Sequence, residues 1–511
     1  MLKTFRIPYE DTQKFSRLVI DYLSEDRRLK SFINHFPEID NFEKQITAKQ
    51  NHPINRKVLV EVLRQQNTDL NLSKKSEKNI DNLLNKDAFT ITTGHQLCLF
   101  TGPLYFLYKI ISALNLAEQL QEKFPEKNIV PVFWMTTEDH DFKEINHIHL
   151  FGKEIVWDNL QSGAVGRMNL SEFESVLHEL KLVLGESENA EKLLNIFENA
   201  YLKHQNLAQA TRYLVNELFG KYGLVILDGD DKILKKQFIP IIKKDVLQQG
   251  FVKTIKQCSE QLAKDYKAQA FVRGINFFTL AEGGRELIKG GITEKEIDKS
   301  PDKFSPNVLL RPLYQETILP NIATIGGGAE AAYWMQLKTA FEQENIPFPI
   351  LVLRNSVLLL SDKQNEKLID LGFGIDDIFK QEHALQKQYV FSQKSTEISL
   401  KKQQEAMEKV FAELLEKTND IAMQNSIKAQ LHKQLSALDK LEEKLIRNEK
   451  KKHETALQQI SKIKNQLFPN NILQERYANF IPFYLKYGDN FIEILKENLN
   501  PLNPNFVVLI L

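Results

Sequence analysis

Thr92-Thr93-Gly94-His95-Gln96 and, three residues on, Leu99-Phe100-Thr101-Gly102-Pro103-Leu104-Tyr105 form a polar, glycine-containing stretch between two apolar ones. An apolar run (88–91) precedes it, and a long apolar helix pattern (104–120) follows it. A strand, a polar glycine loop and a helix in this order direct backbone N–H groups towards an anion. Gly94 permits a turn, and Pro103 is typical of a helix start. An ordinary strand-to-helix connection with an incidental histidine explains this stretch equally well.

A second strand favours the ligand-binding interpretation. Residues 129–135 are apolar nearly throughout, which is typical of a buried parallel strand. The strand leads directly into Glu138, Asp139, His140 and Asp141. Ligands of open α/β sheets bind outside the carboxyl ends of the strands, and ionisable groups are costly there unless they meet water, each other or a substrate. The alternative is a solvated acidic loop with a helix cap.

The chain resembles the bacillithiol biosynthesis cysteine-adding enzymes. The resemblance lies in four ordered motifs and covers essentially the whole length: T-G-H-Q-x-x-x-F-T-G-P-L-Y (93–105), P-V-F-W-M-T-T-E-D-H-D-F-K-E-I-N (131–146), L-R-P-L-Y-Q-E-T (310–317) and I-G-G-G-A-E-A-A-Y-W (325–334). It implies a Rossmann-like core related to nucleotidyl transferases and class I aminoacyl-tRNA synthetases, with inserted connecting segments and a coiled-coil domain. It also implies a reaction that joins L-cysteine to the amino group of glucosaminyl malate to give bacillithiol.

Such amide formation requires an activated carboxylate, so we expect ATP or a related nucleotide as cosubstrate. We expect His95 to donate to a phosphate oxygen or carry a proton, although the stretch lacks the second histidine of the synthetase signature. Asp139 and His140 are the other catalytic candidates. The remaining predicted substrate or nucleotide contacts are Gly94, Gln96, Thr101, Gly102, Glu138, Asp141, Asn146, Arg311, Gly326, Gly327, Gly328 and Glu330.

Several of these residues have simpler explanations. Arg311, placed in a predicted strand over 308–313, could bind a carboxylate such as malate or form a salt bridge to Glu316 or Glu330. Arg354 has the same ambiguity, and a triple glycine is by default a tight turn. Cys98 is better explained as a small core residue than as a catalytic thiol. No C-x-x-C or H-x-x-x-H spacing supports zinc, so no metal site is expected.

Composition narrows the class of protein. The 511 residues carry 67 Lys+Arg and 67 Asp+Glu, and this zero net charge argues against a dedicated nucleic-acid or anionic-membrane surface. Two cysteines fit a reducing cytoplasm and suggest no disulfide framework. The start lacks the apolar core of a signal peptide, and no stretch approaches the roughly 20 apolar residues of a membrane span. We therefore expect a cytoplasmic globular protein.

The pattern along the chain predicts an α/β protein in four parts. Residues 1–86 form a helical lead-in packed on the core, and 87–380 form the Rossmann-like core with insertions at about 145–205 and 250–306. Residues 381–468 lack glycine and repeat leucine at threes and fours, which predicts a coiled coil with a break near 418–420. Residues 469–511 return to the core as a helix and a strand. The apolar seam of the coiled coil needs burial, so we expect a homodimer through this segment.

Two other functions are compatible with this organisation. One is a nucleotidyl- or glycosyl-transferase on the same scaffold. The other is an assembly protein in which the coiled coil carries the function and the Rossmann core is a relic. The polar strand ends favour an enzyme, since a relic need not keep a cluster such as 138–141.

Overall fold

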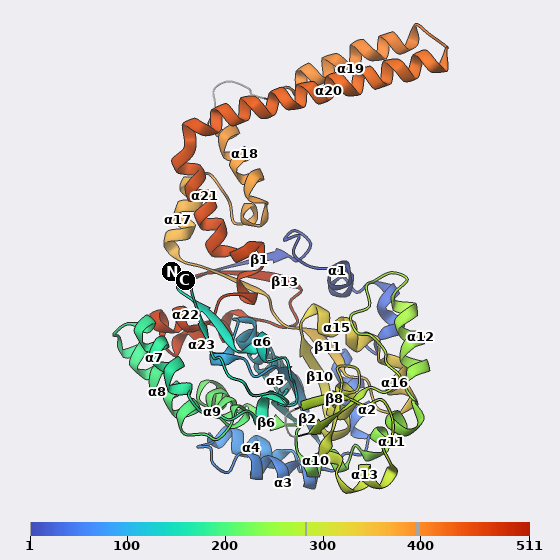
Figure 1. Cartoon of the computed structure of the whole chain (residues 1–511), viewed down its shortest axis with the longest axis vertical. Coiled ribbons are helices and arrows are strands. Elements are labelled where there is room, and N and C mark those ends of the chain that lie inside the picture. The colour runs from blue at the N-terminus through green and yellow to red at the C-terminus, as the bar shows by residue number, and fades with distance from the viewer. Residues whose placement is uncertain (1, 282–283, 394–398) are drawn as a thin grey trace.

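A five-stranded parallel sheet forms the centre of the molecule (Figure 1). The computed structural model describes residues 2–281, 284–393 and 399–511. In spatial order the strands are β11 (Ile350–Leu353), β10 (Asn321–Gly326), β2 (Ala88–His95), β3 (Asn128–Met135) and β6 (Val225–Asp228). In chain order this is fifth, fourth, first, second, third, the arrangement of a Rossmann sheet. The winding direction therefore reverses between β2 and β10.

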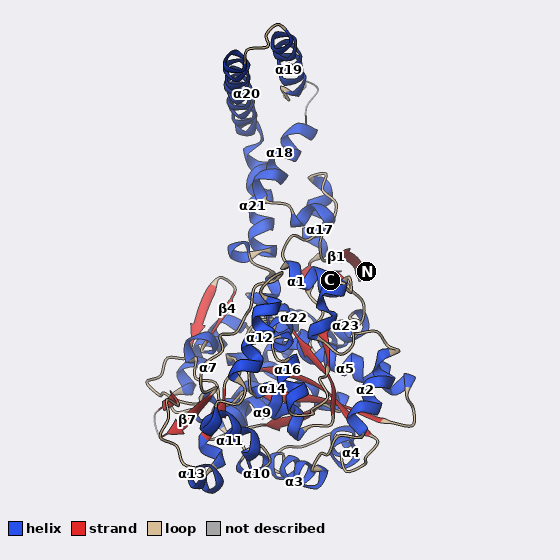
Figure 2. Ribbon diagram, turned by 90° about the vertical axis from the view of Figure 1, so that its right-hand side faces the viewer, coloured by secondary structure: helices blue, strands red, loops and turns tan. Residues whose placement is uncertain are grey.

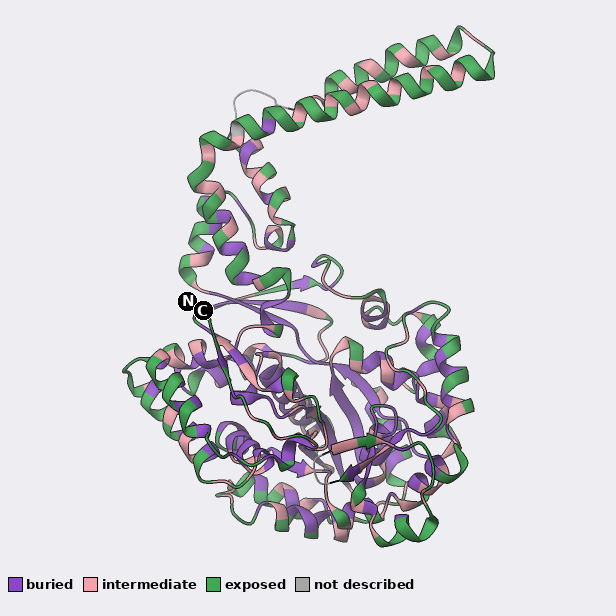
Figure 3. Ribbon diagram, viewed as in Figure 1, coloured by how far each residue is buried: buried purple, intermediate pink, exposed green. Residues whose placement is uncertain are grey.

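The apolar character of the central strands follows from burial on both faces. On β3, Val132 and Trp134 belong to one hydrophobic cluster, whereas Phe133 and Met135 belong to another on the opposite face. Helix α5 (Tyr105–Lys123) packs on β2 and β3, and its side chains are buried around most of its circumference. The predicted strand–helix–strand unit is therefore present, and Figure 3 shows the sheet as the most buried part of the molecule.

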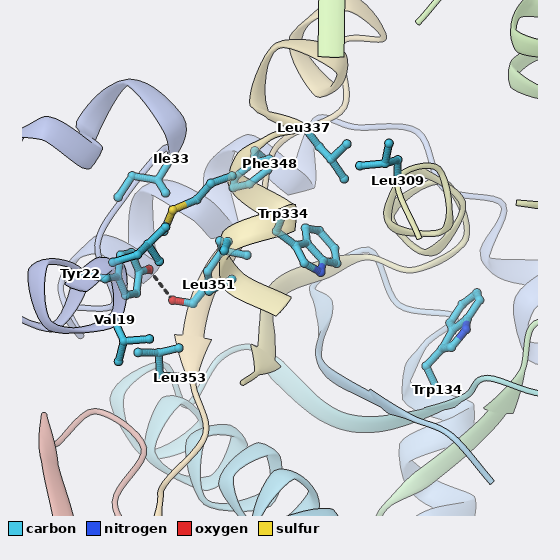
Figure 4. Close-up of a cluster of buried hydrophobic side chains, with 14 of the residues drawn as sticks. Val19, Tyr22, Ile33, Trp134, Leu309, Trp334, Leu337, Phe348, Leu351 and Leu353 are labelled. Atoms are coloured by element: carbon cyan, nitrogen blue, oxygen red, sulfur yellow. Dashed lines mark hydrogen bonds between the residues drawn. The ribbon is translucent and has the colours of Figure 1, made fainter. Parts of the chain in front are cut away.

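The N-terminal segment packs on the core. It holds α1 (Arg17–Leu23), α2 (Asn41–Gln50), α3 (Arg56–Gln66) and α4 (Lys74–Asn82). The hydroxyl of Tyr22 on α1 donates to the carbonyl of Leu351 on β11 at 2.6 Å, beside Val19 and Leu353 (Figure 4). Ahead of these helices, β1 (Lys3–Pro8) pairs antiparallel with β13 (Asn505–Ile510), which pairs parallel with β12 (Val357–Leu360). The two ends of the described chain thus share a second sheet.

Two stretches interrupt the strand–helix alternation of the core. The first contains α6 (Phe142–Ile145), the hairpin β4 (His147–Leu150) and β5 (Lys153–Val156), and the helices α7 (Phe173–Leu184), α8 (Glu188–Leu202) and α9 (Leu207–Phe219). The second contains α10 (Lys232–Lys236), α11 (Ile239–Gln248), α12 (Val252–Leu262), α13 (Glu294–Lys299) and a small antiparallel sheet of β7 (Phe277–Ala281), β8 (Gly284–Leu287) and β9 (Phe304–Pro306).

The predicted strand over 308–313 is wrong. These residues form a turn and then the start of helix α14 (Arg311–Ile318), with Pro312 in its first turn. Proline removes a donor that a central strand needs, but it costs nothing at a helix start. The strand in this region is β10, which the sequence analysis did not predict. Helices α15 (Gly328–Met335) and α16 (Lys338–Gln343) follow it.

The C-terminal third leaves the core as a helical arm and returns (Figure 1). It runs through α17 (Asp362–Asp370), α18 (Glu382–Ser392), α19 (Lys401–Glu416), α20 (Ile421–Lys450) and α21 (Glu454–Leu467), then α22 (Ile481–Tyr487) and α23 (Asn490–Asn498). Helices α19 and α20 pack as a hairpin, and the chain turns between them where the break at 418–420 is predicted.

The arm projects from the core, as Figure 2 shows, and the burial colours of Figure 3 show it as the most exposed part of the molecule. Val410, Leu441 and Leu445 are 54%, 51% and 49% exposed. The hairpin therefore buries only part of the predicted apolar seam. In the described part of the chain, no helix combines the length and apolarity required for a membrane span.

Candidate active site

A cavity of about 390 Å³ lies where the winding of the sheet reverses. Its walls come from the carboxyl ends of β2, β3 and β10, from the start of α14 and α15, and from the small sheet of the second insertion. Of the predicted site residues it brings together Gly94, His95, Gln96, Glu138, Asp139, Arg311, Gly327, Gly328 and Glu330. We refer to this cavity as the switch-point pocket.

His95 is the last residue of β2 and is buried against the rings of Tyr105 and Phe106. Its Nδ1 lies 3.0 Å from the carbonyl oxygen of Gln96 and so carries a proton, because a carbonyl only accepts. Burial, together with the charge of Lys109, lowers the pKa of His95 well below its usual value. The ring is neutral, and Nε2 is a buried acceptor without a partner among the described residues. This geometry does not fit the predicted donation to phosphate, since the free ring nitrogen accepts.

The sharp turn after β2 lies at Gly102 and not at Gly94. Gly94 is within β2, whereas Phe100, Thr101 and Gly102 have φ of 47°, 68° and 65°. The side-chain amide of Asn479 donates to the carbonyls of Phe100 at 3.0 Å and Gly102 at 2.6 Å. Thr101 and Gly102 do not line the pocket, so the structure places these two predicted contacts in the turn that starts α5.

Cys98 lies in the same turn and is 5% exposed. Burial raises the pKa of its thiol to about 12, so the thiolate is not populated near neutrality. Cys98 is the small core residue that the sequence analysis expects.

Glu138 belongs to a buried charge network behind the pocket. Lys235, on α10, contacts Glu138 at 2.5 Å and Asp230 at 2.9 Å, and Arg167 contacts Asp230 at 2.7 Å. Burial raises the pKa of Glu138 despite the attraction of Lys235. Burial acts on Asp230 in the same direction, but Lys235 and Arg167 outweigh it and lower the pKa of that carboxyl. Glu138 is therefore the carboxyl of this network that binds a proton more readily.

Asp139 faces the pocket beside Gln96. The Gln96 amide nitrogen donates to Asp139 Oδ2 at 2.7 Å and to Glu144 Oε2 at 2.8 Å, so one amide joins two carboxylates. Glu144 was not singled out from the sequence, and only its contact with Gln96 identifies it.

Three predicted residues beside this cluster lie outside the pocket lining. His140 is exposed, and its Nδ1 is 3.2 Å from an Arg285 guanidinium nitrogen, from which it accepts. Asp141 is exposed ahead of α6. Asn146 has a structural role, since its amide nitrogen donates to the carbonyl of Trp157 at 3.2 Å.

The triple glycine forms the junction between β10 and α15, on the opposite wall. Gly326 ends β10 and does not line the pocket, whereas Gly327 and Gly328 do. The N–H of Gly327 donates to Glu330 at 2.9 Å, and Glu330 pairs with Lys109 at 2.5 Å. Lys109 also donates to the carbonyl of Gly94 at 2.8 Å and so joins the ends of β2 and β10.

The pocket contains guanidinium groups that have no carboxylate of the described residues at ion-pair distance. Arg311 donates to the side chain of Gln315 at 3.0 Å, and Arg285 to the carbonyl of Pro306 at 2.9 Å. Neither these two nor Arg476 has an ion pair among the described residues, although all three line the pocket. The predicted salt bridge from Arg311 is absent there, because Glu316 pairs with Lys49 and Glu330 with Lys109.

Arg354 differs from these three arginines. It is buried and pairs with the buried Glu475 at 2.7 Å, so its charge is already compensated. Arg285 and Arg476 were missed in the sequence, because they lie in an insertion hairpin and after the arm, far along the chain from the motifs of the core.

Fold and pocket together define an α/β protein of Rossmann type with a charged ligand pocket at the switch point of its sheet and a helical arm. Residues 2–355 match the family model described as "Bacillithiol biosynthesis BshC, N-terminal Rossmann-like domain", and residues 357–511 match "Bacillithiol biosynthesis BshC, C-terminal coiled-coil domain". The chain belongs to the bacillithiol biosynthesis BshC family. This confirms the family and the fold class predicted from the sequence.

Relatives match the chain over nearly its whole length. The protein named "Putative cysteine ligase BshC" from Flavobacterium psychrophilum is 43% identical and the one from Christiangramia forsetii 44% identical, each with 98% of both chains covered. The protein of the same name from Cytophaga hutchinsonii is 36% identical, with 98% of this chain and 97% of the relative covered. The family is therefore one of enzymes named as ligases.

Proposed function

We propose that the switch-point pocket joins the carboxyl group of L-cysteine to the amino group of glucosaminyl malate and so forms bacillithiol. The observation that carries the proposal is the set of three guanidinium groups, Arg285, Arg311 and Arg476, on the walls of one pocket with no carboxylate of the described residues at ion-pair distance. Guanidinium groups bind carboxylates and phosphates through paired hydrogen bonds. A substrate with the two carboxylates of malate, together with a phosphate-bearing cosubstrate, supplies negative charge for these guanidinium groups.

The carboxylates on the other side of the pocket suit the amines of the reaction. Asp139 faces the pocket beside Glu138, and an ammonium group such as that of cysteine is attracted to carboxylates. Glu138, whose pKa is raised, is the group suited to take the proton that the attacking amine loses, and the free Nε2 of His95 can accept a hydrogen bond from that amine and orient it. His140 has no such role in this proposal, because Arg285 occupies its Nδ1.

The carboxylate is activated by ATP in this proposal. The cysteine carboxylate attacks the α-phosphorus, which forms an acyl–phosphate bond and releases pyrophosphate. The amine of glucosaminyl malate then attacks the acyl carbon, loses one proton to a base of the pocket, and displaces AMP as the amide bond forms. The position of the pocket supports this cosubstrate, since nucleotides bind Rossmann sheets at the switch point.

Isotope exchange between pyrophosphate and ATP tests the proposal with the purified full chain. We expect exchange that requires cysteine, and bacillithiol once glucosaminyl malate is added. Serine in place of cysteine is the matched control. Cysteine-dependent release of phosphate without exchange would show that the activated intermediate is an acyl phosphate and not an adenylate. Transfer of a nucleotidyl or glycosyl group to glucosaminyl malate without cysteine would establish the rival transferase. If none of these reactions occurs, the assembly function is the remaining candidate.

We further propose that the protein is a cytoplasmic homodimer whose arm joins the two copies. Both cysteines are buried and free, which suits a reducing compartment. The exposed apolar residues of α19 and α20, described above, offer a surface for a second arm.

A further inference from the structure

The hairpin of β4 and β5 carries a compact group of metal-ligating side chains. Each of His147, His149 and Glu154 offers a ligand atom within 4.8 Å of the others. None of the three lines the switch-point pocket. We propose that these residues bind one Zn²⁺ ion, and this proposal does not depend on the reaction proposed above.

The backbone of the hairpin brings the three side chains together. His147 and His149 are two residues apart on β4 and so point to the same face. His149 lies directly opposite Glu154 in the antiparallel register, which places their Cβ atoms about 4.5–5.5 Å apart. His149 Nε2 is 4.0 Å from Glu154 Oε1. Ligand atoms around zinc are closer than this, and the exposed side chain of Glu154 can swing inwards to close the difference.

Neighbouring residues orient the two imidazoles. The amide nitrogen of Asn146 donates to the carbonyl of Trp157, so the amide oxygen of Asn146 faces His147 Nδ1, 3.2 Å away. His147 Nδ1 therefore carries the proton, and the lone pair is on Nε2, as in zinc sites where a second residue fixes the ring. The ring of His149 stacks on Tyr477 with centroids 4.3 Å apart and planes at 5°. Both rings are thus held by residues outside the ligand set.

The ligand types select the metal. Two imidazoles and one carboxylate form a common three-residue set for Zn²⁺, whereas Mg²⁺ and Ca²⁺ prefer oxygen ligands alone. Three protein ligands leave one position for water. The hairpin is also connected to the pocket, because His149 stacks on Tyr477 and forms a β-bridge to Ala478, the two residues that follow the pocket residue Arg476. Bound zinc would therefore hold this edge of the pocket in place. The His-x-His spacing on a strand differs from C-x-x-C and H-x-x-x-H, so these spacings do not reveal the group.

Metal titration of the chelator-treated full chain tests the proposal. We expect one equivalent of Zn²⁺ to bind in competition with a fluorescent indicator, and one Co²⁺ to give a tetrahedral absorption band. His149→Phe keeps a ring on Tyr477 but removes the ligand, and Glu154→Gln keeps the shape but removes the charge. Each should weaken Zn²⁺ binding by at least about tenfold. The matched control is His178→Gln, an exposed histidine of α7, which should bind as the wild type does.

A second measurement needs no variant. Zn²⁺ should protect His147 and His149, but not His178, from modification by diethylpyrocarbonate in the wild-type chain. Absence of micromolar binding by the wild type, equal binding by His149→Phe, or equal modification with and without Zn²⁺ would each overturn the proposal.

Discussion

His95 shows how burial decides what one side chain of the pocket can do. A histidine in water takes up a proton near neutral pH, but this one is enclosed by aromatic rings and a lysine, and its Nδ1 is bound to a backbone carbonyl. It is left with one unused lone pair. Glu138 is affected in a complementary way, because burial favours its protonated form. These opposite effects make His95 a hydrogen-bond acceptor and Glu138 a proton carrier on neighbouring walls of the pocket.

The first prediction concerns these groups. Glu138→Gln should lower kcat/KM for bacillithiol formation by about 10²-fold or more, the usual effect of losing a proton-transfer group, and His95→Ala should lower it through the loss of the hydrogen-bond acceptor that orients the amine. Asp139→Asn should reduce it through weaker amine binding and a higher KM. Asp141→Asn, at an exposed position outside the pocket, is the control and should be fully active. Thiol labelling measures product, and circular dichroism checks folding. Full activity of the first three variants would remove the assignment.

A second prediction concerns Asp245 on α11, which is fully buried and accepts from the backbone N–H of Asn276 at 2.6 Å. Burial raises its pKa to about 6. Between pH 4 and 6 the folded chain holds a proton that the unfolded chain has released, so stability falls as pH rises through this window. A shift of about two units corresponds to up to about 3 kcal/mol.

Urea denaturation of the wild type and of Asp245→Asn at several pH values measures this effect. The amide does not titrate, so the free energy of unfolding of the wild type, relative to the variant, should decrease from pH 4 to 6 and then level off. A constant difference would contradict the raised pKa. Taking the difference removes the contribution of the other carboxylates.

At the scale of the element, the turn from β2 to α5 is sensitive to substitution. Gly102 has φ 65° and ψ −143°, and a Cβ atom there would lie 2.5 Å from Cys98 Cβ. Gly102→Ala should therefore destabilise the protein by about 1–3 kcal/mol or more. Gly374→Ala is the matched control, because its nearest neighbour is a flexible carboxylate at 3.8 Å, and it should stay within about 0.5 kcal/mol. Chemical denaturation measures both, and equal midpoints would show that the turn relaxes without cost.

Elements with an unbroken local pattern are predictable from this sequence. Strand β3 is apolar because both its faces are covered, and the turn between α19 and α20 is marked by Thr418 and Asp420, whose side chains accept backbone N–H groups. Strand β10 was missed because Asn321 and Thr324 interrupt its apolar run. Both are buried in a polar network with Glu316 and Gln315, which only the tertiary structure supplies.

The same limit applies to the candidate site. The ends of β2 and β3 follow from the strand pattern, and so do His95 and Glu138. Lys235 contacts Glu138 from a helix, and Arg285 faces the pocket from a hairpin, and both lie more than ninety residues away from Glu138 along the chain. No spacing rule connects residues that only the folding of insertions brings together.

At the scale of the whole molecule, the fourth prediction concerns the association of two chains through the arm. The chain should be a homodimer in solution, because apolar residues along α19 and α20 remain exposed in one copy. Leu435 and Leu438 are half-buried within the hairpin, so charging them would also disturb its internal packing. Leu441→Glu together with Leu445→Glu charges the more exposed positions and should give folded monomers. Lys444→Glu is the control for added negative charge.

Light scattering at micromolar concentration measures the molecular mass, and circular dichroism shows whether the helices persist. A monomeric wild type would exclude the dimer. A variant that stays dimeric would place the interface elsewhere on the molecule.

The pairing of β1 with β13 has a consequence for synthesis on the ribosome. Lys3 pairs with Ile510, so at roughly 5–20 residues per second the first strand waits roughly 25–100 s for its partner. Because β13 is the middle strand of its sheet, β1 and β12 are both open edges of the nascent chain until it emerges. Lys3, Arg6 and Pro8 on β1 are residue types that discourage an open edge from pairing with other chains. The nascent protein thus carries its own protection against aggregation on the strand that must wait longest.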